Sequence, residues 1–493
     1  MDFRAANTSI VSVSPKLAYF CVYNPSLGTT EETQDKQVLF YAAHDEVPID
    51  VQVRQTGLAQ ALVNFTKVFS LSKPCENVHT QKNRLAFLEP EPGYWIHISV
   101  HLGYLQKMVK TKDGKIKPIF EYLDENLHDS EIRKMLELGY ELFRLFNGTF
   151  SSIVKNSGIS GLKSKLSEFY GTWVFEWDWE KTELTKIIDG MYYLPLPGSP
   201  HTCVTSLVTA LEKDYDMISN TFVLWNNKLL YIPTFRGLTR NLSGSNLFSY
   251  FTTGFSQNTN TENTTKDAAS SDSTTVSALA ANFLTGVPVD SEENGTSPLT
   301  VHLHKVGSQV GKNVAKEENV EHYLVAYKHD SLIVGFLIPS SKPSMSTNIR
   351  SLGFYQALDD YLSTHIEGIS NLLKEGNDHS RKTGADVDKE YRYLFCNKLT
   401  LAVRSSIYSP AGKGLAINTE MAHVLCNLHE DMEKYQNLTE IYTRSSNNFW
   451  VVGKRHDGRE LYVIVEKKDA KLAEVEEDVR RLTALYFSGI FMD

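Results

Sequence analysis

The sequence contains few cysteines and no long apolar run. Its 493 residues include five cysteines, spread from position 21 to position 426 without a C-x-x-C pair. A disulfide framework needs an even set of cysteines and a zinc knuckle needs closely spaced pairs, so neither is expected. No stretch reaches the roughly 18 consecutive apolar residues that span a bilayer as a helix. We therefore expect reduced thiols and no membrane-spanning segment.

An excess of positive charge is also lacking. The formal net charge is -9 at pH 7, whereas a protein that binds the nucleic-acid backbone needs a basic surface. The first residues have neither the apolar core of a signal peptide, nor the arginines of a transit peptide, nor a Met-Gly start. The sequence thus predicts a cytoplasmic protein that does not bind nucleic acid and reaches membranes through a partner.

Signatures of catalysis are missing as well. The nearest approach to a phosphate-binding loop, at 307–313, is one residue short and has asparagine where Ser or Thr would bind magnesium. Neither G-x-S-x-G nor H-E-x-x-H is present. His97 and His101 are four residues apart on an expected strand, which separates them by about 13 Å. This distance is too long for both side chains to bind one metal ion. We predict no catalytic residue, cofactor or metal site.

A repeating pattern of apolar strand pairs and amphipathic helices is present. Asp457-Gly458 separates two β-rich runs, and this dipeptide is a strong hairpin signal because both turn residues tolerate positive φ. Similar pairs surround 226–227 and 329–330. Apolar residues also recur at helical spacing. The helical segments are expected near 58–69, 132–146, 204–211, 348–374, 421–432 and 472–487.

Two polar stretches interrupt this order. Residues 256–275 have almost no apolar side chain, so we expect a disordered insert. Residues 375–389 are interpreted as a linker. The result is an α+β protein of three units, 15–182, 186–374 and 390–493, each with an antiparallel sheet and helices packed against it.

The stretch His79-Thr-Gln-Lys-Asn-Arg84 contains six polar residues before an apolar strand. It is either an exposed connection or a recognition surface, since loops on a rigid scaffold often carry binding residues. Together with other segments, it resembles the vacuolar fusion protein Ccz-one family. The matching motifs are VYNP at 22–25, VLFY at 38–41, KPC at 73–75, HTQKNR at 79–84, EPE at 89–91, LFNGTF at 145–150, WVVGK at 450–454 and RELYVI at 459–464.

Membership of this family implies three longin domains, each a five-stranded antiparallel sheet flanked by helices. It further implies pairing with Mon-one, a related longin protein. The pair is expected to act as a guanine nucleotide exchange factor for the Rab-seven GTPase on late endosomal and lysosomal membranes. A third subunit and phosphoinositide-containing membranes are further candidate partners. Exchange needs no covalent chemistry, because differential binding of GTPase states supplies the effect.

The resemblance directs attention to two sets of residues in the first domain. Leu58, Leu62 and Phe65 are candidates for a longin-pairing helix, although core packing is the alternative. The second set, His79, Lys82 and Arg84, contains candidates for contacts with the GTPase or the sister subunit. Two rival functions stay open: a longin-type adaptor or coat subunit without exchange activity, and a cytosolic hydrolase whose catalytic residues are dispersed in the sequence.

Overall fold

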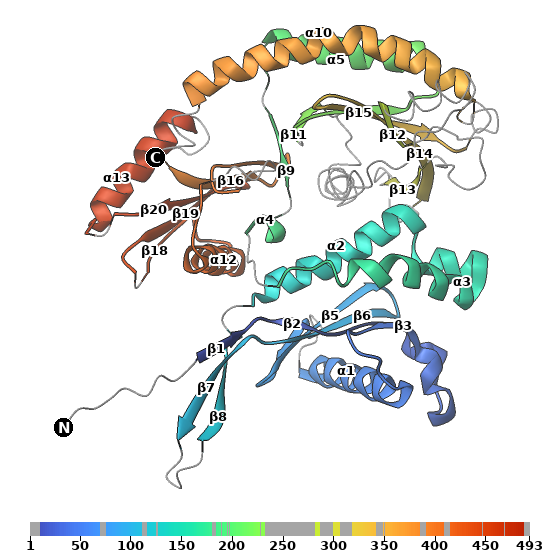
Figure 1. The fold of residues 1–493 in the computed structure, drawn as a ribbon, viewed down its shortest axis with the longest axis vertical. Coiled ribbons are helices and arrows are strands. Elements are labelled where there is room, and N and C mark those ends of the chain that lie inside the picture. Colours follow the sequence, from blue (N-terminus) through green and yellow to red (C-terminus); the bar gives the residue numbers. More distant parts are fainter. Residues whose placement is uncertain are drawn as a thin grey trace. The chain divides into compact units, whose positions relative to one another are not determined.

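The computed structural model describes residues 10–69, 75–110, 116–231 (without 125–126, 180–183, 189, 195, 197 and 227), 282–285, 299–305, 318–341, 349, 351–384, 391–408 and 415–487 (without 446 and 468). The chain divides into two compact units, Met1–Ile187 and Ile188–Asp493, and Figure 1 labels their elements. Among the described helices, none is long and apolar enough to cross a bilayer. The predicted insert 256–275 and the loop 307–313 lie outside the described residues.

The first unit is built on a five-stranded antiparallel sheet with the order β3-β2-β6-β5-β4. Two short 3-10 helices, η1 (Pro25–Leu27) and η2 (Glu31–Gln37), connect its first two strands along the chain. Every neighbouring pair of strands is antiparallel. The strands are β2 (Lys16–Tyr23), β3 (Val38–Ala42), β4 (Asn77–His79), β5 (Asn83–Glu91) and β6 (Tyr94–His101).

Helices cover both faces of this sheet (Figure 1). Helix α1 (Ile49–Phe69) packs on one face over Tyr19, Cys21 and Phe87. Helices α2 (Asp129–Asn147) and α3 (Phe150–Trp173) form the core on the other face. The predicted apolar face of α2 is buried at Ile132, Met135, Leu136 and Phe143. Sequence periodicity did not indicate α3, which is interrupted at Gly158, where φ is 70°.

The buried carboxylate of Glu91 anchors the start of α3. It accepts hydrogen bonds from the Phe150 and Ser151 backbone N–H groups, the latter at 3.0 Å, and from the Tyr140 hydroxyl at 2.9 Å. The first N–H groups of a helix have no intrahelical partner, and the helix dipole favours a negative charge there. Two of the family motifs, at 89–91 and 145–150, therefore meet in the structure.

A separate three-stranded sheet extends the first unit. Strand β7 (Tyr104–Lys110) lies between β1 (Ile10–Val13) and β8 (Ile116–Tyr122), and both pairings are antiparallel. Residues 111–115, between β7 and β8, lie outside the described residues. The five-stranded sheet of the resemblance therefore has an addition that the sequence did not indicate.

The second unit contains a six-stranded antiparallel sheet with the order β11-β10-β15-β14-β12, in which β13 also pairs with β14. Helices α5 (Gly198–Asp214) and α10 (Leu352–Gly384) pack on the same face of it. Helix α10 continues through residues 375–384, so this part of the expected linker is helical; polar composition does not end a helix. The strands are β10 (Asn220–Trp225), β11 (Lys228–Tyr231), β12 (Phe283–Thr285), β13 (Leu299–Lys305), β14 (Glu318–His329) and β15 (Leu332–Pro339).

The other sheet of this unit has the order β18-β19-β20-β16-β17-β9. Helices α12 (Thr419–Lys434) and α13 (Leu472–Tyr486) pack on its opposite faces. Its last strand, β9 (Met191–Tyr192), pairs in parallel with β17 and comes from residues that we assigned to the second domain. The remaining strands are β16 (Arg392–Asn397), β17 (Ala402–Ser405), β18 (Glu440–Arg444), β19 (Trp450–His456) and β20 (Arg459–Val465).

Among the described residues, the expected five strands per sheet are correct for the sheet that contains β2, whereas the sheet that contains β14 and the sheet that contains β20 have six each. The short helix α4 (Leu184–Ile187) ends the first unit close to the predicted boundary at 182–186. A division of the second unit into 186–374 and 390–493 stays a prediction. The hairpin at Asp457-Gly458 is confirmed: His456 pairs with Arg459, and the two turn residues have φ of 46° and 73°.

Candidate partner-docking surface

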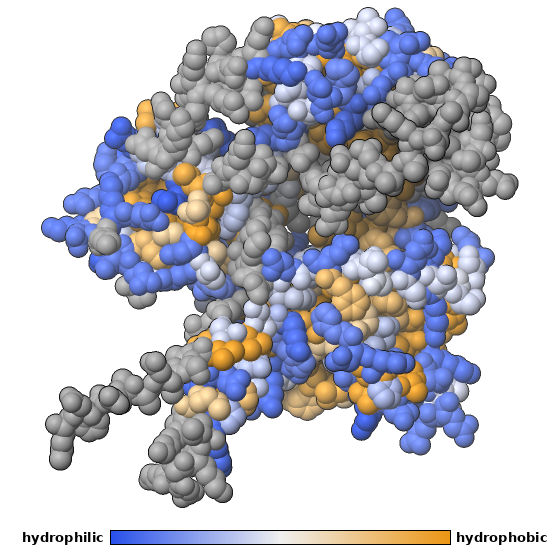
Figure 2. Space-filling view, in the orientation of Figure 1, coloured by the Kyte–Doolittle hydropathy of each residue, from blue (hydrophilic) through white to orange (hydrophobic). Residues whose placement is uncertain are grey.

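Helix α1 carries a row of large apolar side chains that its own domain does not cover. Leu58, Phe65 and Phe69 are 55%, 64% and 76% exposed, and the neighbouring Val68 is 74% exposed. Leu62 is partly buried against the core beneath the helix. The rings of Phe65 and Phe69 contact each other, with centroids 4.9 Å apart. Apolar side chains are visible over α1 in Figure 2. We call Leu58, Leu62, Phe65 and Phe69 the α1 stripe.

Small residues on α1 explain why the stripe is exposed. The helix buries Thr56, Ala59 and Val63, whose short side chains let its backbone lie close to the sheet. The Thr56 hydroxyl bonds the Gln52 carbonyl at 2.9 Å and lies 3.6 Å from Cys21 Sγ. A stripe at i, i+4, i+7 and i+11 is then displaced to the side of the buried face. The predicted helix is confirmed, but Leu58 and Phe65 are not core residues.

His97 lies beneath α1 and has a packing role. Its ring stacks on Phe87 with centroids 4.8 Å apart and meets the edge of Tyr19 at 5.2 Å. Burial lowers the pKa of His97 to about 3, so the side chain is neutral at physiological pH. His101, the other member of the pair, is exposed at the end of β6, where its Nδ1 lies 2.6 Å from Asn83 Oδ1.

The residues of the 79–84 stretch have different environments. His79 ends β4, Arg84 lies in β5, and the exposed Lys82 lies in the turn between them. Arg84 is 3% exposed; its guanidinium bonds Asp124 Oδ1 at 2.6 Å and also contacts Asp129. His79 Nε2 lies 2.8 Å from Asp129 Oδ2. Two of the three candidates therefore bind aspartates of their own chain.

The expectation that Arg84 contacts a GTPase or sister subunit is not supported by this placement. Its charge is enclosed by the start of α2 and the preceding loop, so an outside carboxylate could not reach it. His79 keeps a half-exposed side chain, 45% accessible, and Lys82 is exposed. These two residues stay candidates for polar contacts, whereas Arg84 positions the turn that presents them.

Arg84→Met is expected to lower the free energy of unfolding by about 2 kcal/mol, because it leaves Asp124 and Asp129 facing each other without their cation. Partial exposure of both carboxylates keeps the loss below that of a fully buried pair. Urea unfolding of the full-length chain would measure the change. The control Lys82→Met removes a neighbouring exposed charge and should change stability by less than about 0.5 kcal/mol. Equal stability of the two variants would contradict the positioning role.

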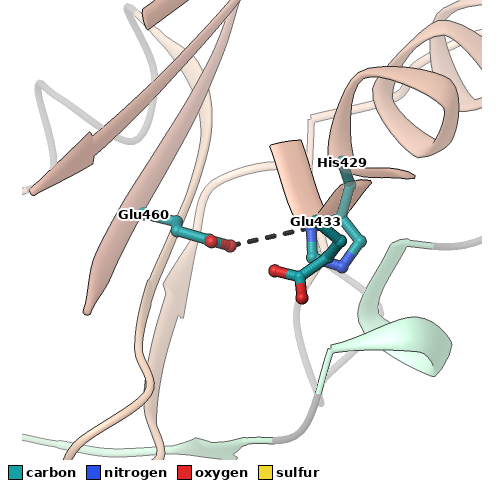
Figure 3. A group of neighbouring side chains, drawn as sticks. All are labelled: His429, Glu433 and Glu460. Atoms are coloured by element: carbon teal, nitrogen blue, oxygen red, sulfur yellow. Dashed lines mark ion pairs between the residues drawn. The ribbon is translucent and has the colours of Figure 1, made fainter. Parts of the chain in front are cut away.

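A second cluster of polar side chains lies between α12 and the β18-β19-β20-β16-β17-β9 sheet, which we call the third sheet. His429 and Glu433 of α12 and Glu460 of β20 place nitrogen and oxygen atoms within 4.8 Å of one another (Figure 3). Glu460 is fully buried. Its Oε1 accepts Lys398 Nζ at 2.9 Å and Arg455 Nη2 at 2.7 Å, while Oε2 accepts the Tyr462 hydroxyl at 2.8 Å.

This cluster is an internal ion-pair network of the third sheet. Two side-chain cations, Lys398 and Arg455, contact both Glu433 and Glu460, so a metal ion would have to displace them. Burial alone would raise the pKa of Glu460, but Lys398, His429 and Tyr462 hold it below its ordinary value. No pattern in the sequence indicated the network, because its members come from α12, β19, β20 and the turn that follows β16.

Comparisons with known proteins agree with this architecture. Residues 17–148 match the family model described as the first longin domain of INTU, CCZ1 and HPS4, and residues 387–482 match the model described as Intu longin-like domain 3. The first match contains β2 to β6, α1 and α2. The second contains the five strands β16 to β20 and helix α12. Residues 17–148 and 387–482 are therefore similar to longin domains.

Full-length relatives extend the match to the region between these domains. The chain is 29% identical over 490 residues to the vacuolar fusion protein CCZ1 homolog of Xenopus laevis, covering 97% of each chain. It is 27% identical to the homolog of Nematostella vectensis, covering 98% of this chain and 99% of the relative. Identity to the homolog of Dictyostelium discoideum is 25%, covering 98% and 100%. The chain is thus a homologue of the vacuolar fusion protein CCZ1 over nearly its whole length.

Proposed function

We propose that the protein is one subunit of a guanine nucleotide exchange factor that pairs with a Mon-one longin protein and activates the Rab-seven GTPase. The observation that carries the proposal is the α1 stripe, an uncovered apolar helix face on a domain that matches the first longin domain of CCZ1. Homology to vacuolar fusion proteins over 97% of the chain supports a role in membrane fusion pathways.

In this proposal the stripe contacts the sister subunit. Leu58, Phe65, Val68 and Phe69 expose enough apolar surface to form the centre of an interface, where aromatic and aliphatic anchors contribute most of the binding energy. His79 and Lys82 lie at the β4–β5 turn of the same domain and supply polar contacts to the GTPase or the sister subunit. The middle region, 186–374, is proposed to be a second longin domain.

The activity requires no bond to be made or broken by this chain. An exchange factor binds the nucleotide-free GTPase more tightly than the loaded form, and this difference shifts the population toward states that release GDP. The pair is proposed to work from the cytoplasm on late endosomal and lysosomal membranes that contain phosphoinositides. There it would support endosome maturation and fusion of autophagosomes with lysosomes, and a third subunit could join it.

The test is release of a fluorescent guanine nucleotide from purified Rab-seven. The chain alone, Mon-one alone and the co-purified pair are compared at equal concentration. The proposal expects strong acceleration only by the pair, since each subunit supplies part of the surface that binds the GTPase. A stable pair that leaves the release rate unchanged would remove the exchange proposal for this GTPase.

A longin-type adaptor or coat subunit is the second candidate, because an uncovered apolar helix would serve it equally well. The two differ in one measurable property. An adaptor would hold the GTP-loaded and nucleotide-free forms of a GTPase with similar affinity, or bind neither. The exchange factor must prefer the nucleotide-free form, and titration of both forms against the immobilised pair distinguishes these cases.

A further inference from the structure

The three-stranded sheet β1-β7-β8 extends from the first unit, and close backbone contacts hold its base. Strand β7 is joined to β6 by Leu102 and Gly103. The backbone at Gly103 is closely packed, because a Cβ there would lie 3.0 Å from the Val13 carbonyl oxygen and 3.1 Å from Pro15. The Leu123 N–H closes the base by bonding the Gly103 carbonyl at 2.8 Å. Beyond this base the β7–β8 hairpin projects away from the five-stranded sheet (Figure 1).

Apolar side chains are exposed on both faces of this small sheet. The register places Val11, Gln106 and Phe120 in one row, so Val11 and Phe120 share a face with Met108. These three apolar side chains are 50%, 46% and 37% exposed, respectively. Ile119 points to the opposite face and is 52% exposed. Apolar side chains also lie over β1 in Figure 2.

The charge of the hairpin is opposite in sign to that of the whole chain. Its strands carry Lys107, Lys110 and Lys117 but a single acidic residue, Glu121, whereas the protein has a net charge of -9. Lys107 pairs with Glu121. Lys117 is exposed on β8, so its long side chain can place an ammonium group beside an anionic surface.

We propose that this sheet inserts its exposed apolar side chains into the surface of an anionic lipid bilayer. Apolar side chains exposed on both faces favour a lipid bilayer, because lipid surrounds an inserted sheet on both sides. A protein partner would cover only one face. The strands contain 4, 7 and 7 residues, fewer than the roughly 20–30 that one side of a typical protein interface uses. A few apolar side chains beside lysines are sufficient for reversible membrane binding.

This inference deepens the proposed function, because it assigns a membrane contact to this chain itself. The test uses the co-purified pair and flotation with vesicles of phosphatidylcholine mixed with phosphatidylserine, or of phosphatidylcholine alone. Combined Val11→Ser, Met108→Ser and Phe120→Ser should weaken binding to the anionic vesicles about tenfold. Lys117→Glu should weaken it about fivefold. The control pair Leu472→Ser and Leu485→Ser, exposed apolar residues of α13, should bind like the wild type.

Nucleotide release measured without vesicles separates this inference from the proposed function. The triple variant should keep the release rate of the wild-type pair in solution, whatever that rate is. Unchanged flotation of the triple variant would overturn the inference, as would equal wild-type binding to the two kinds of vesicle. Loss of co-purification with the sister subunit, without loss of flotation, would instead identify the sheet as a protein interface.

Discussion

Replacement of both Leu58 and Phe65 by aspartate is expected to abolish co-purification of the chain with its sister subunit. Each side chain is more than half exposed in the isolated chain, and covering a large apolar side chain contributes on the order of 1.5–3 kcal/mol. Two buried aspartates would add a desolvation cost. The combined loss corresponds to an affinity at least about 100-fold weaker. Exchange activity should fall with it, since the composite surface no longer forms.

The fold itself should tolerate this double substitution. The side chains that hold α1 to the sheet are Thr56, Ala59 and Val63, and none of them is changed. Thermal unfolding followed by circular dichroism should therefore match the wild type. As a control, Asn64→Asp adds a charge on another side of the same helix and should leave pairing intact. Wild-type affinity of the double variant would place the sister subunit elsewhere.

Glu460→Gln is expected to destabilise the third sheet more than Arg84→Met destabilises the first. The carboxylate is fully buried and bonded to Lys398, Arg455 and Tyr462. Removal of its charge leaves cations beside an uncharged amide, and breaking a buried ion pair costs about 3–5 kcal/mol. Hydrogen exchange should show the loss locally, as faster exchange of the β19 and β20 amides. Glu433→Gln, in the same network but 43% exposed, should cost less than about 1 kcal/mol.

The pH dependence of stability gives a second measure of the Glu460 network. The folded-state pKa of Glu460 lies below its ordinary value of 4.5, so the folded state binds this proton less readily than the unfolded state. The resulting stability is fully present above pH 4.5 and is lost as the pH falls through the folded-state pKa. Glu460→Gln should therefore flatten this part of the acid unfolding curve. A variant with the same acid sensitivity as the wild type would exclude Glu460 as the responsible group.

Local chemistry was sufficient to predict several elements of the fold. Asp457-Gly458 specifies its hairpin because both residues tolerate the positive φ that the turn requires. Helix α2 follows from apolar residues spaced to meet one sheet face. Helix α3 was missed, because a helix interrupted at Gly158 and anchored by Glu91 depends on a contact 59 residues away in the sequence. Helix propensity alone does not report such a contact.

The candidate surface was only partly predictable. Spacing placed Leu58, Leu62 and Phe65 on one helix face, but it did not decide whether that face is core or surface. The sheet decided it by packing against Ala59 and Val63 instead. Arg84 looked like an exposed cation in the sequence, whereas aspartates 40 and 45 residues away enclose it in the structure. The sequence by itself determined the family motifs, the turns and the helix periodicities, all of which depend on neighbouring residues. Only the tertiary structure decided which side chains are buried, because burial depends on contacts between segments far apart in the chain.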